Sequence, residues 1–461
     1  MTKKLSNFTR KSRKVNRDIN KTERRARNIA KRVIQRKHFS RFIRILGPGV
    51  VTGAADDDPS GIATYSQAGA VYGYGLLWAF PFMYPLLVAV QESCSRIGAV
   101  TGKGLAAVIK THYSKKLLYM SVILVVLANT VNIGADLGAM AATTQLFFNI
   151  PFAVLVIIYA IIIILLVVFV NYKKYVKILK WLALSLLAYP VTALLVGQDW
   201  PAVWSNTFSL APQINASTMY LVVGMIGTTI SPYLFFWDTS EVVEEEISKH
   251  RLTMSGNNPK ISRRFLRGVR MDNFVGMSLA TITAWFIVIA CAAVLFKNGI
   301  TEINTAADAA KALEPLVKGF PDAGLVAKII FSVGIVGVGL LAVPVLAGSS
   351  SYAISETFGW KEGLYRKFKK AFGFYIVIIA ATVIGVLINF LGIDPIKALV
   401  FTAVFNSIAS VPLLWMLVKV GNNTDIMGEY KNKLISNIFV RLAAIVITIS
   451  VLMLFYFMIF P

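Results

Sequence analysis

Apolar runs recur through the whole chain, and many of them reach the roughly 20 residues that an α-helix needs to cross a lipid bilayer. A soluble core cannot absorb so much apolar sequence, since 56% of the 461 residues are hydrophobic and only 15% are charged. The pattern therefore predicts an all-α polytopic membrane protein. It excludes a secreted enzyme, a disordered scaffold and an ordinary cytosolic domain.

The apolar runs predict eleven membrane-spanning helices. Their expected ranges are 45–71, 75–97, 117–148, 152–170, 178–197, 219–246, 271–296, 325–357, 371–391, 396–418 and 434–459. Together they form a single transmembrane domain over residues 45–461, and residues 1–44 precede it as a basic arm.

Lys and Arg are unevenly distributed over the loops. Residues 1–44 hold 17 of the 47, and the five loops that follow the even-numbered spans hold 24 more. Loops rich in Lys and Arg stay in the cytoplasm, so we expect a multi-pass protein of the plasma (inner) membrane, with the N-terminus cytoplasmic and the C-terminus outside. This asymmetry explains the net charge of +24 without nucleic acid. It makes the bilayer, and anionic lipids at the basic arm, the expected partners.

Two helices are interrupted at matching positions, five spans apart. The first span contains Asp-Pro-Ser-Gly at 58–61, and the sixth contains Gly-Thr-Thr-Ile-Ser-Pro-Tyr at 227–233. Proline lacks the amide donor that continues a helix, so both helices are expected to break there. Five helices followed by five in the opposite orientation is the plan of many secondary transporters. We expect such repeats over about 45–197 and 219–418, followed by an extra helix at 434–459.

Three consecutive carboxylates, Asp56, Asp57 and Asp58, lie at the first break. A carboxylate at mid-membrane is costly unless it is hydrated or paired, so it indicates a functional site. Asp58 is expected to bind a cation directly, while Asp56 and Asp57 point about 100° apart on a helix and line the cavity or assist. In the sixth span, Thr228 would offer its backbone carbonyl and Ser231 its hydroxyl.

Other polar residues lie within the spans. Asn129, Asn132 and Asp136 follow the spacing i, i+3, i+7, which places them on one face of the third span. We expect Asp136 to face the cavity and the asparagines to join helices. Asn406 in the tenth span is a weaker candidate of the same kind. No nucleophile–base arrangement appears, so we expect neither an enzyme nor a bound cofactor.

The first span resembles the Nramp family of divalent-metal transporters. The likeness runs from Gly47-Pro48-Gly49 through Asp58-Pro59 to Gln67-Ala68-Gly69, and the eleven-span plan extends it across residues 45–459. The later spans match only loosely. The resemblance implies a LeuT-like fold with a 5+5 inverted repeat and broken helices 1 and 6. It also implies alternating access, in which helices 1 and 6 move against helices 3, 4, 8 and 9.

Two metal-binding positions of that family are changed here. Gly61 stands at the position of the family's Asn, and Ser231 at that of its Met. Without the thioether, the site is oxygen-lined and suits Mg²⁺, Ca²⁺ and Mn²⁺; we also expect it to be roomier, as a partly hydrated Mg²⁺ requires. The chain therefore resembles the Nramp-related magnesium transporter branch. We expect it to carry Mg²⁺ as the main cargo and Mn²⁺ as a further one.

The family's proton route is altered as well. Its two helix 6 histidines fall on Tyr233 and Asp238, and in helix 3 its Asp and Glu fall on Ile133 and Asp136. Histidine titrates most readily near neutral pH, so its loss predicts weak or absent proton coupling. The residues expected to line the cavity or to support the metal ligands are Gly61, Tyr233, Asp136, Asn406 and Asp238.

Three alternatives stay open. An ordinary proton-coupled Mn²⁺/Fe²⁺ transporter would have the missing Met and His. A sodium-coupled transporter of an organic solute is disfavoured because the acidic break would repel an anionic substrate. A non-transporting membrane sensor is disfavoured because no predicted loop is long enough to form a soluble signalling domain.

Overall fold

The structure is a computed structural model that describes residues 52–53, 55–170, 187–209, 215–248, 261–317 and 322–460. The predicted basic arm at 1–44 lies outside these residues. So do the first part of the predicted span 45–71 and about half of the predicted span 178–197. The interactions of the basic arm with lipid therefore stay predictions.

All regular structure in the described ranges is helical. The long unbroken helices are α4 (Ala79–Thr101), α6 (Lys115–Thr144), α7 (Phe152–Phe169), α13 (Arg263–Val294), α15 (Ala323–Phe358), α16 (Phe372–Ile388), α17 (Pro395–Asn422) and α19 (Leu434–Ile459). Broken spans supply α3 (Pro59–Tyr72), α11 (Ala216–Thr229) and α12 (Pro232–Ser248). Shorter helices are α5 (Leu105–His112), α9 (Ala188–Leu195), α10 (Trp200–Phe208), α14 (Ala306–Lys311) and α18 (Thr424–Met427). Single 3₁₀ turns are η2 (Phe296–Asn298), η3 (Glu314–Val317), η4 (Phe368–Lys370), η5 (Asn389–Leu391) and η6 (Gly428–Tyr430).

Eight of the described helical segments are long and apolar enough to cross a membrane: α6, α7, the pair α11–α12, α13, α15, α16, α17 and α19. Helix α4 corresponds to the predicted second span at 75–97. It is not among these eight because its second half is polar. It contains the buried residues Gln91, Glu92 and Arg96, which contact neighbouring helices rather than lipid. The predicted all-α polytopic architecture is confirmed.

Both predicted helix breaks are present. Asp58 has an extended backbone (φ −64°, ψ 171°), its side chain accepts the Gly61 amide at 2.8 Å, and Pro59 begins α3. Helix α11 ends where Ile230 leaves the helical region (φ −113°, ψ 62°), and Pro232 begins α12. In each case proline removes the amide that would have continued the preceding helix.

The helices form two mutually packed sets. Helices α6, α7, α15 and α16 contact one another, which is the scaffold set expected from helices 3, 4, 8 and 9. Helix α3 packs on α13 and α11, helix α12 packs on α4, and α4 packs on α13, while α17 contacts α3, α6, α11 and α12. The two breaks therefore lie where α6 and α17 meet the broken helices.

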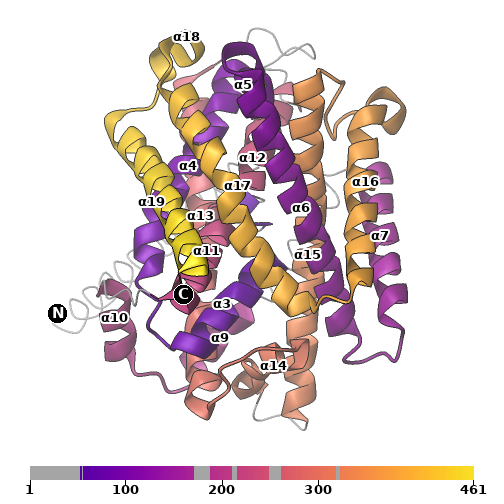
Figure 1. Ribbon diagram of the computed structural model, residues 1–461, viewed down its shortest axis with the longest axis vertical. Helices are drawn as coiled ribbons and strands as arrows, with labels where there is room; N and C mark the ends of the chain where they lie inside the picture. The colour runs from indigo at the N-terminus through magenta and orange to yellow at the C-terminus, as the bar shows by residue number, and fades with distance from the viewer. Residues whose placement is uncertain are drawn as a thin grey trace, which may run out of the picture. The chain divides into compact units, whose positions relative to one another are not determined.

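Short helices mark the two ends of the helical bundle. Helices α5 and α18 lie at one end, while α10 and α14 lie at the other (Figure 1). Helix α5 follows the second predicted span and α18 the tenth, whereas α10 follows the fifth and α14 the seventh. Alternate connections thus lie at opposite ends, as helices that each cross the membrane once require. The Lys and Arg distribution predicts that the α5–α18 end is cytoplasmic.

Gly227 allows α11 to approach α17 closely beside the second break. A Cβ atom at this position would lie 2.0 Å from the carbonyl oxygen of Ala403, which is backbone and cannot move aside. We expect Gly227→Ala to lower the free energy of unfolding by about 1–3 kcal/mol, as overpacking does. Gly268→Ala on α13 is the matched control, because a Cβ there meets no atom within 4 Å. Thermal unfolding in detergent measures both, and equal stability of the two variants would contradict this packing.

Candidate functional site

Asp58 lies at the first break and is 1% exposed. Its Oδ1 accepts hydrogen bonds from the Ser60 hydroxyl and the Gly61 amide, and its Oδ2 accepts one from Asn132 Nδ2 at 2.8 Å. These three donors are neutral, and they fix the orientation of the carboxylate without neutralising it. The negative charge of Asp58 is therefore available to a cation.

Helix α6 brings two polar residues to Asp58. Asn132 donates a hydrogen bond to Asp58 and accepts one from the Thr402 hydroxyl at 2.7 Å. It therefore links α3, α6 and α17. Asp136 lies one turn further along α6, is fully buried and is close enough to Asp58 to interact electrostatically. Neither oxygen of Asp136 has a hydrogen-bond partner in the described part of the chain. Asn129 instead donates to α15, so it joins helices as expected.

The second break brings hydroxyl groups to the site. Ser231 Oγ donates to the carbonyl oxygens of Gly227 and Thr228, each at 2.8 Å. The Thr228 carbonyl, which the sequence predicted as a cation ligand, is thus already an acceptor within the break. The Thr228 hydroxyl was not predicted, yet it is buried and lacks a partner within the described ranges. Thr228 therefore presents its side chain to the site.

Gly61 is the point where α3 and α11 approach each other. A Cβ atom built on Gly61 would lie 2.9 Å from the Thr228 hydroxyl and 3.6 Å from the Asp56 carbonyl oxygen. The expectation that glycine makes the site roomier here is wrong, because the Thr228 side chain occupies that space. Glycine instead permits close approach of the two broken helices.

Tyr233 and the two upstream carboxylates surround the first break. Tyr233 donates its hydroxyl to the carbonyl oxygen of Ala55 at 2.9 Å, which satisfies one acceptor in the chain just before the break. Asp56 and Asp57 are 2% and 4% exposed, and both lie close enough to Asp58 to repel it. No three Asp, Glu, His or Cys side chains converge on a metal position anywhere in the described residues. Asp56 and Asp57 as further ligands of a cation at Asp58 therefore stay predictions.

Helix α17 contributes an amide that the sequence ranked low. Asn406 is fully buried, and neither its Oδ1 nor its Nδ2 has a partner among the described residues. It lies one turn after Thr402, the residue bonded to Asn132, and so shares its face of α17. Thr402 was missed by the sequence analysis; its spacing of four residues from Asn406 is the signal that could have identified it.

Several buried polar atoms near the breaks thus lack protein partners. They are Oδ1 of Asp56, both carboxylate oxygens of Asp136, the Thr228 hydroxyl and both amide atoms of Asn406. Most buried polar side-chain atoms in proteins have a hydrogen-bond partner, which is either protein or water. A cation with its remaining water is one partner that these atoms could take.

Asp238 does not join this group. It accepts hydrogen bonds from Ser95 of α4, from Asn273 of α13 at 3.1 Å and from Thr52 at 3.4 Å. It also lies seven residues, or roughly 10 Å, along α12 from Ser231. The structure therefore places Asp238 in a polar network between α4, α12 and α13, apart from Asp58.

Asn406 and Asn129 form a matched pair for testing the site. We expect Asn406→Ala to weaken cation binding by about ten- to a hundredfold with little loss of stability, because no protein hydrogen bond is lost. Asn129→Ala removes bonds to α15 and should cost about 1 kcal/mol of stability with binding unchanged. Metal titration and thermal unfolding of both variants check this. Equal effects of the two on binding would contradict the assignment of Asn406.

A buried carboxylate beside two broken helices is a feature of secondary transporters with a LeuT-like fold. The model of the family described as Nramp, "Natural resistance-associated macrophage protein-like", matches residues 49–457. The chain therefore belongs to the Nramp family and is a multi-pass membrane protein.

Relatives and solved structures agree with this family and fold. The divalent metal cation transporter MntH of Caldanaerobacter subterraneus subsp. tengcongensis is 26% identical over 430 residues, which cover 90% of this chain and 94% of that relative. The manganese transporter of Eremococcus coleocola, in complex with an aromatic bis-isothiourea substituted compound, superposes with a TM-score of 0.69 at 18% identity, covering 90% of this chain and 86% of that one. MhsT in complex with L-phenylalanine superposes with a TM-score of 0.60 at 14% identity, covering 88% and 98%.

Proposed function

We propose that the chain carries divalent metal cations across the membrane by alternating access. The observation that supports this most directly is the buried Asp58 carboxylate at the junction of two broken helices. It lies beside polar atoms on α6, α11 and α17 that have no hydrogen-bond partner in the part of the chain that the structure describes. Membership of the Nramp family, and the name "divalent metal cation transporter" carried by its relatives, support the same function. Because these side chains are buried, a cation reaches them only if helices move.

Each side chain has a proposed role. Asp58 supplies the charge that binds the cation, and the oxygens of Thr228, Ser231 and Asn406 complete its shell together with water. Asp136 supplies a second negative charge close by. Helices α3, α11 and α12 would move against the set α6, α7, α15 and α16, opening the site to one side and then to the other.

The proposed cargo is a hard divalent cation. The side chains brought to Asp58 offer oxygen donors, which suit Mn²⁺ and Mg²⁺ better than softer metals. The structural similarity to the manganese transporter of Eremococcus coleocola favours Mn²⁺, as in the ordinary transition-metal alternative. Mg²⁺ transport, and membership of the magnesium branch, are supported by the donor set alone, since Ser231 replaces a thioether. We therefore propose Mn²⁺ as a cargo and Mg²⁺ as an ion that the same oxygens admit.

Weak proton coupling is also a proposal. Tyr233 donates its hydroxyl to the Ala55 carbonyl oxygen, and Asp238 lies in a separate hydrogen-bond network. Neither residue therefore replaces a titrating histidine beside Asp58. Asp136 lies near Asp58, neither of its carboxylate oxygens has a hydrogen-bond partner among the described residues, and it is our candidate for residual proton transfer. Uptake would then be driven mainly by the membrane potential, at about 2.3 kcal/mol per charge per 100 mV.

Proteoliposomes that hold a metal indicator and a pH dye test the function. We expect Mn²⁺ and Mg²⁺ to enter, faster with an inside-negative potential, with little acidification of the lumen. Entry of Mn²⁺ alone with matching acidification would support the proton-coupled alternative and overturn the Mg²⁺ proposal. Entry of neither ion, in protein that still unfolds cooperatively, would overturn metal transport and favour a sensor.

A further inference from the structure

A basic cavity of about 360 Å³ lies between α4, α13 and the segment that leads into α19. None of the residues around Asp58 lines it. Its lining includes six basic side chains: Arg96, Arg263, Arg267, Arg270, Lys431 and Lys433. We propose that this cavity binds a phosphate-bearing anion.

The positive charge of the cavity is only partly neutralised. Of the two carboxylates that line it, Glu92 pairs with Arg96 and with Arg270, the latter at 3.0 Å, and Glu429 is the other. The basic side chains that form no ion pair with any described residue are Arg263, Arg267, Lys431 and Lys433. A compact anion with several acceptor oxygens is the ligand that such a group of donors fits.

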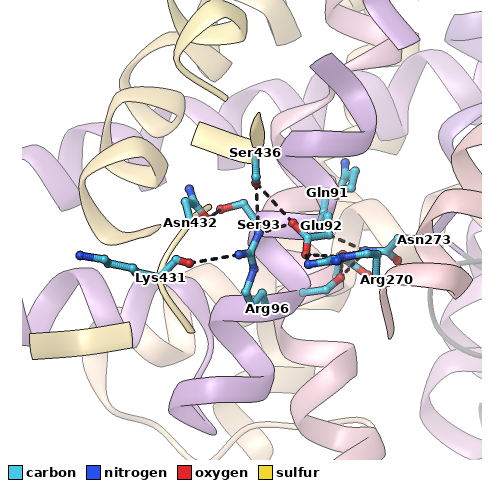
Figure 2. A network of polar contacts seen from close by, with 11 residues as sticks. Gln91, Glu92, Ser93, Arg96, Arg270, Asn273, Lys431, Asn432 and Ser436 are labelled. Atoms are coloured by element: carbon cyan, nitrogen blue, oxygen red, sulfur yellow. Dashed lines mark hydrogen bonds and ion pairs between the residues drawn. The ribbon is translucent and has the colours of Figure 1, made fainter. Parts of the chain in front are cut away.

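The cavity is built on a fixed frame (Figure 2). Arg96 is 6% exposed; it donates to the Ser436 hydroxyl at 3.1 Å and to the Lys431 carbonyl oxygen at 3.4 Å. The Asn432 amide donates to the end of α17 at 2.8 Å. These bonds hold the backbone of the segment from Lys431 to Lys433 against α4 and α17, beside Arg96.

The surroundings of the cavity favour a lipid as the source of the phosphate. The cavity is lined by the second half of α4, the first turns of α13 and the residues just before α19, at the end predicted to be cytoplasmic. Leu434, Ile435 and Ile438 follow on α19 and are 74%, 71% and 52% exposed. An acyl chain can lie on this apolar surface while its headgroup enters the cavity. Basic pockets between membrane helices on the cytoplasmic side bind anionic headgroups in this way.

The test uses the full chain in neutral detergent. The thermal unfolding midpoint is followed while phosphatidylglycerol, phosphatidylcholine or inorganic phosphate is added. The test variant is Arg267→Gln/Lys433→Gln, which changes two exposed side chains that make no ion pair within the described ranges. The control variant is Lys369→Gln/Lys370→Gln, which removes the same charge from exposed positions of η4 outside the cavity.

We expect phosphatidylglycerol, but not phosphatidylcholine, to stabilise the natural chain and the control. The test variant should need at least about ten times as much phosphatidylglycerol for the same shift in the thermal unfolding midpoint. Stabilisation by inorganic phosphate that is likewise lost in the test variant would support the site with a soluble ligand. Equal responses of the two variants to both anions, or an equal effect of phosphatidylcholine, would overturn the proposal. Stabilisation by lipid requires no metal transport, so this result is independent of the proposed cargo.

Discussion

Asp58→Asn is expected to abolish metal uptake while leaving the protein folded. The asparagine keeps the size of the side chain and an oxygen that can accept the Gly61 amide, so the cap of α3 is largely preserved. The negative charge is lost. Two unit charges 4 Å apart attract by about 4 kcal/mol at an effective dielectric constant of about 20, and a divalent cation doubles this. Losing even a third of that attraction would weaken cation binding by about a hundredfold.

Uptake into proteoliposomes, at equal amounts of folded protein, measures this effect. Asp425→Asn is the matched control, because Asp425 is exposed on α18 and its substitution should leave uptake unchanged. Asp56→Asn and Asp57→Asn should reduce uptake less than Asp58→Asn, since neither shares the hydrogen bonds that orient Asp58. Normal uptake by Asp58→Asn would exclude Asp58 as a cation ligand.

Glu92→Ala is expected to have the largest effect on stability. Glu92 pairs with Arg96, and the two side chains are only 11% and 7% exposed. Removing one partner of a buried ion pair leaves the other charge unpaired, which costs about 3–5 kcal/mol. The bonds of Arg96 to Ser436 and Lys431 offset part of this cost, so we expect a loss of about 3 kcal/mol.

Arg270→Ala is the control for that loss. Arg270 pairs with the other oxygen of Glu92, but its side chain is 58% exposed, and exposed pairs contribute less than about 1 kcal/mol. Thermal or denaturant unfolding in detergent compares the two variants with the natural chain. A Glu92→Ala protein no less stable than Arg270→Ala would mean that Arg96 does not depend on its ion pair.

Much of the fold could be predicted because the bilayer imposes simple local rules. The length of an apolar run predicts a membrane span, the distribution of Lys and Arg predicts which loops are cytoplasmic, and proline predicts where a helix breaks. These rules located the broken helices at Pro59 and Pro232 to within a residue or two. They also indicated Asp58, since a charged residue beside a break in a membrane span is rare enough to stand out.

The contacts between helices could not be predicted in the same way. They depend on how each helix is rotated and shifted against its neighbours, which a single sequence does not specify. Thr402 meets Asn132, Thr228 fills the space beside Gly61, and Asp238 turns to α4 and α13 instead of Asp58. The expectation of more room at Gly61 was wrong for this reason: it counted the missing atoms of Gly61 without the Thr228 side chain opposite.

The most direct test of the proposed function is to locate a bound cation. Crystals or grids of the natural chain prepared with Mn²⁺ would be compared with Asp58→Asn, using the anomalous signal of manganese where crystals diffract. We predict one Mn²⁺ within about 2.0–2.6 Å of an Asp58 oxygen, near Thr228 and Asn406, that is absent from the variant and displaced by excess Mg²⁺. A Mn²⁺ bound away from Asp58, or retained in Asp58→Asn, would contradict the site.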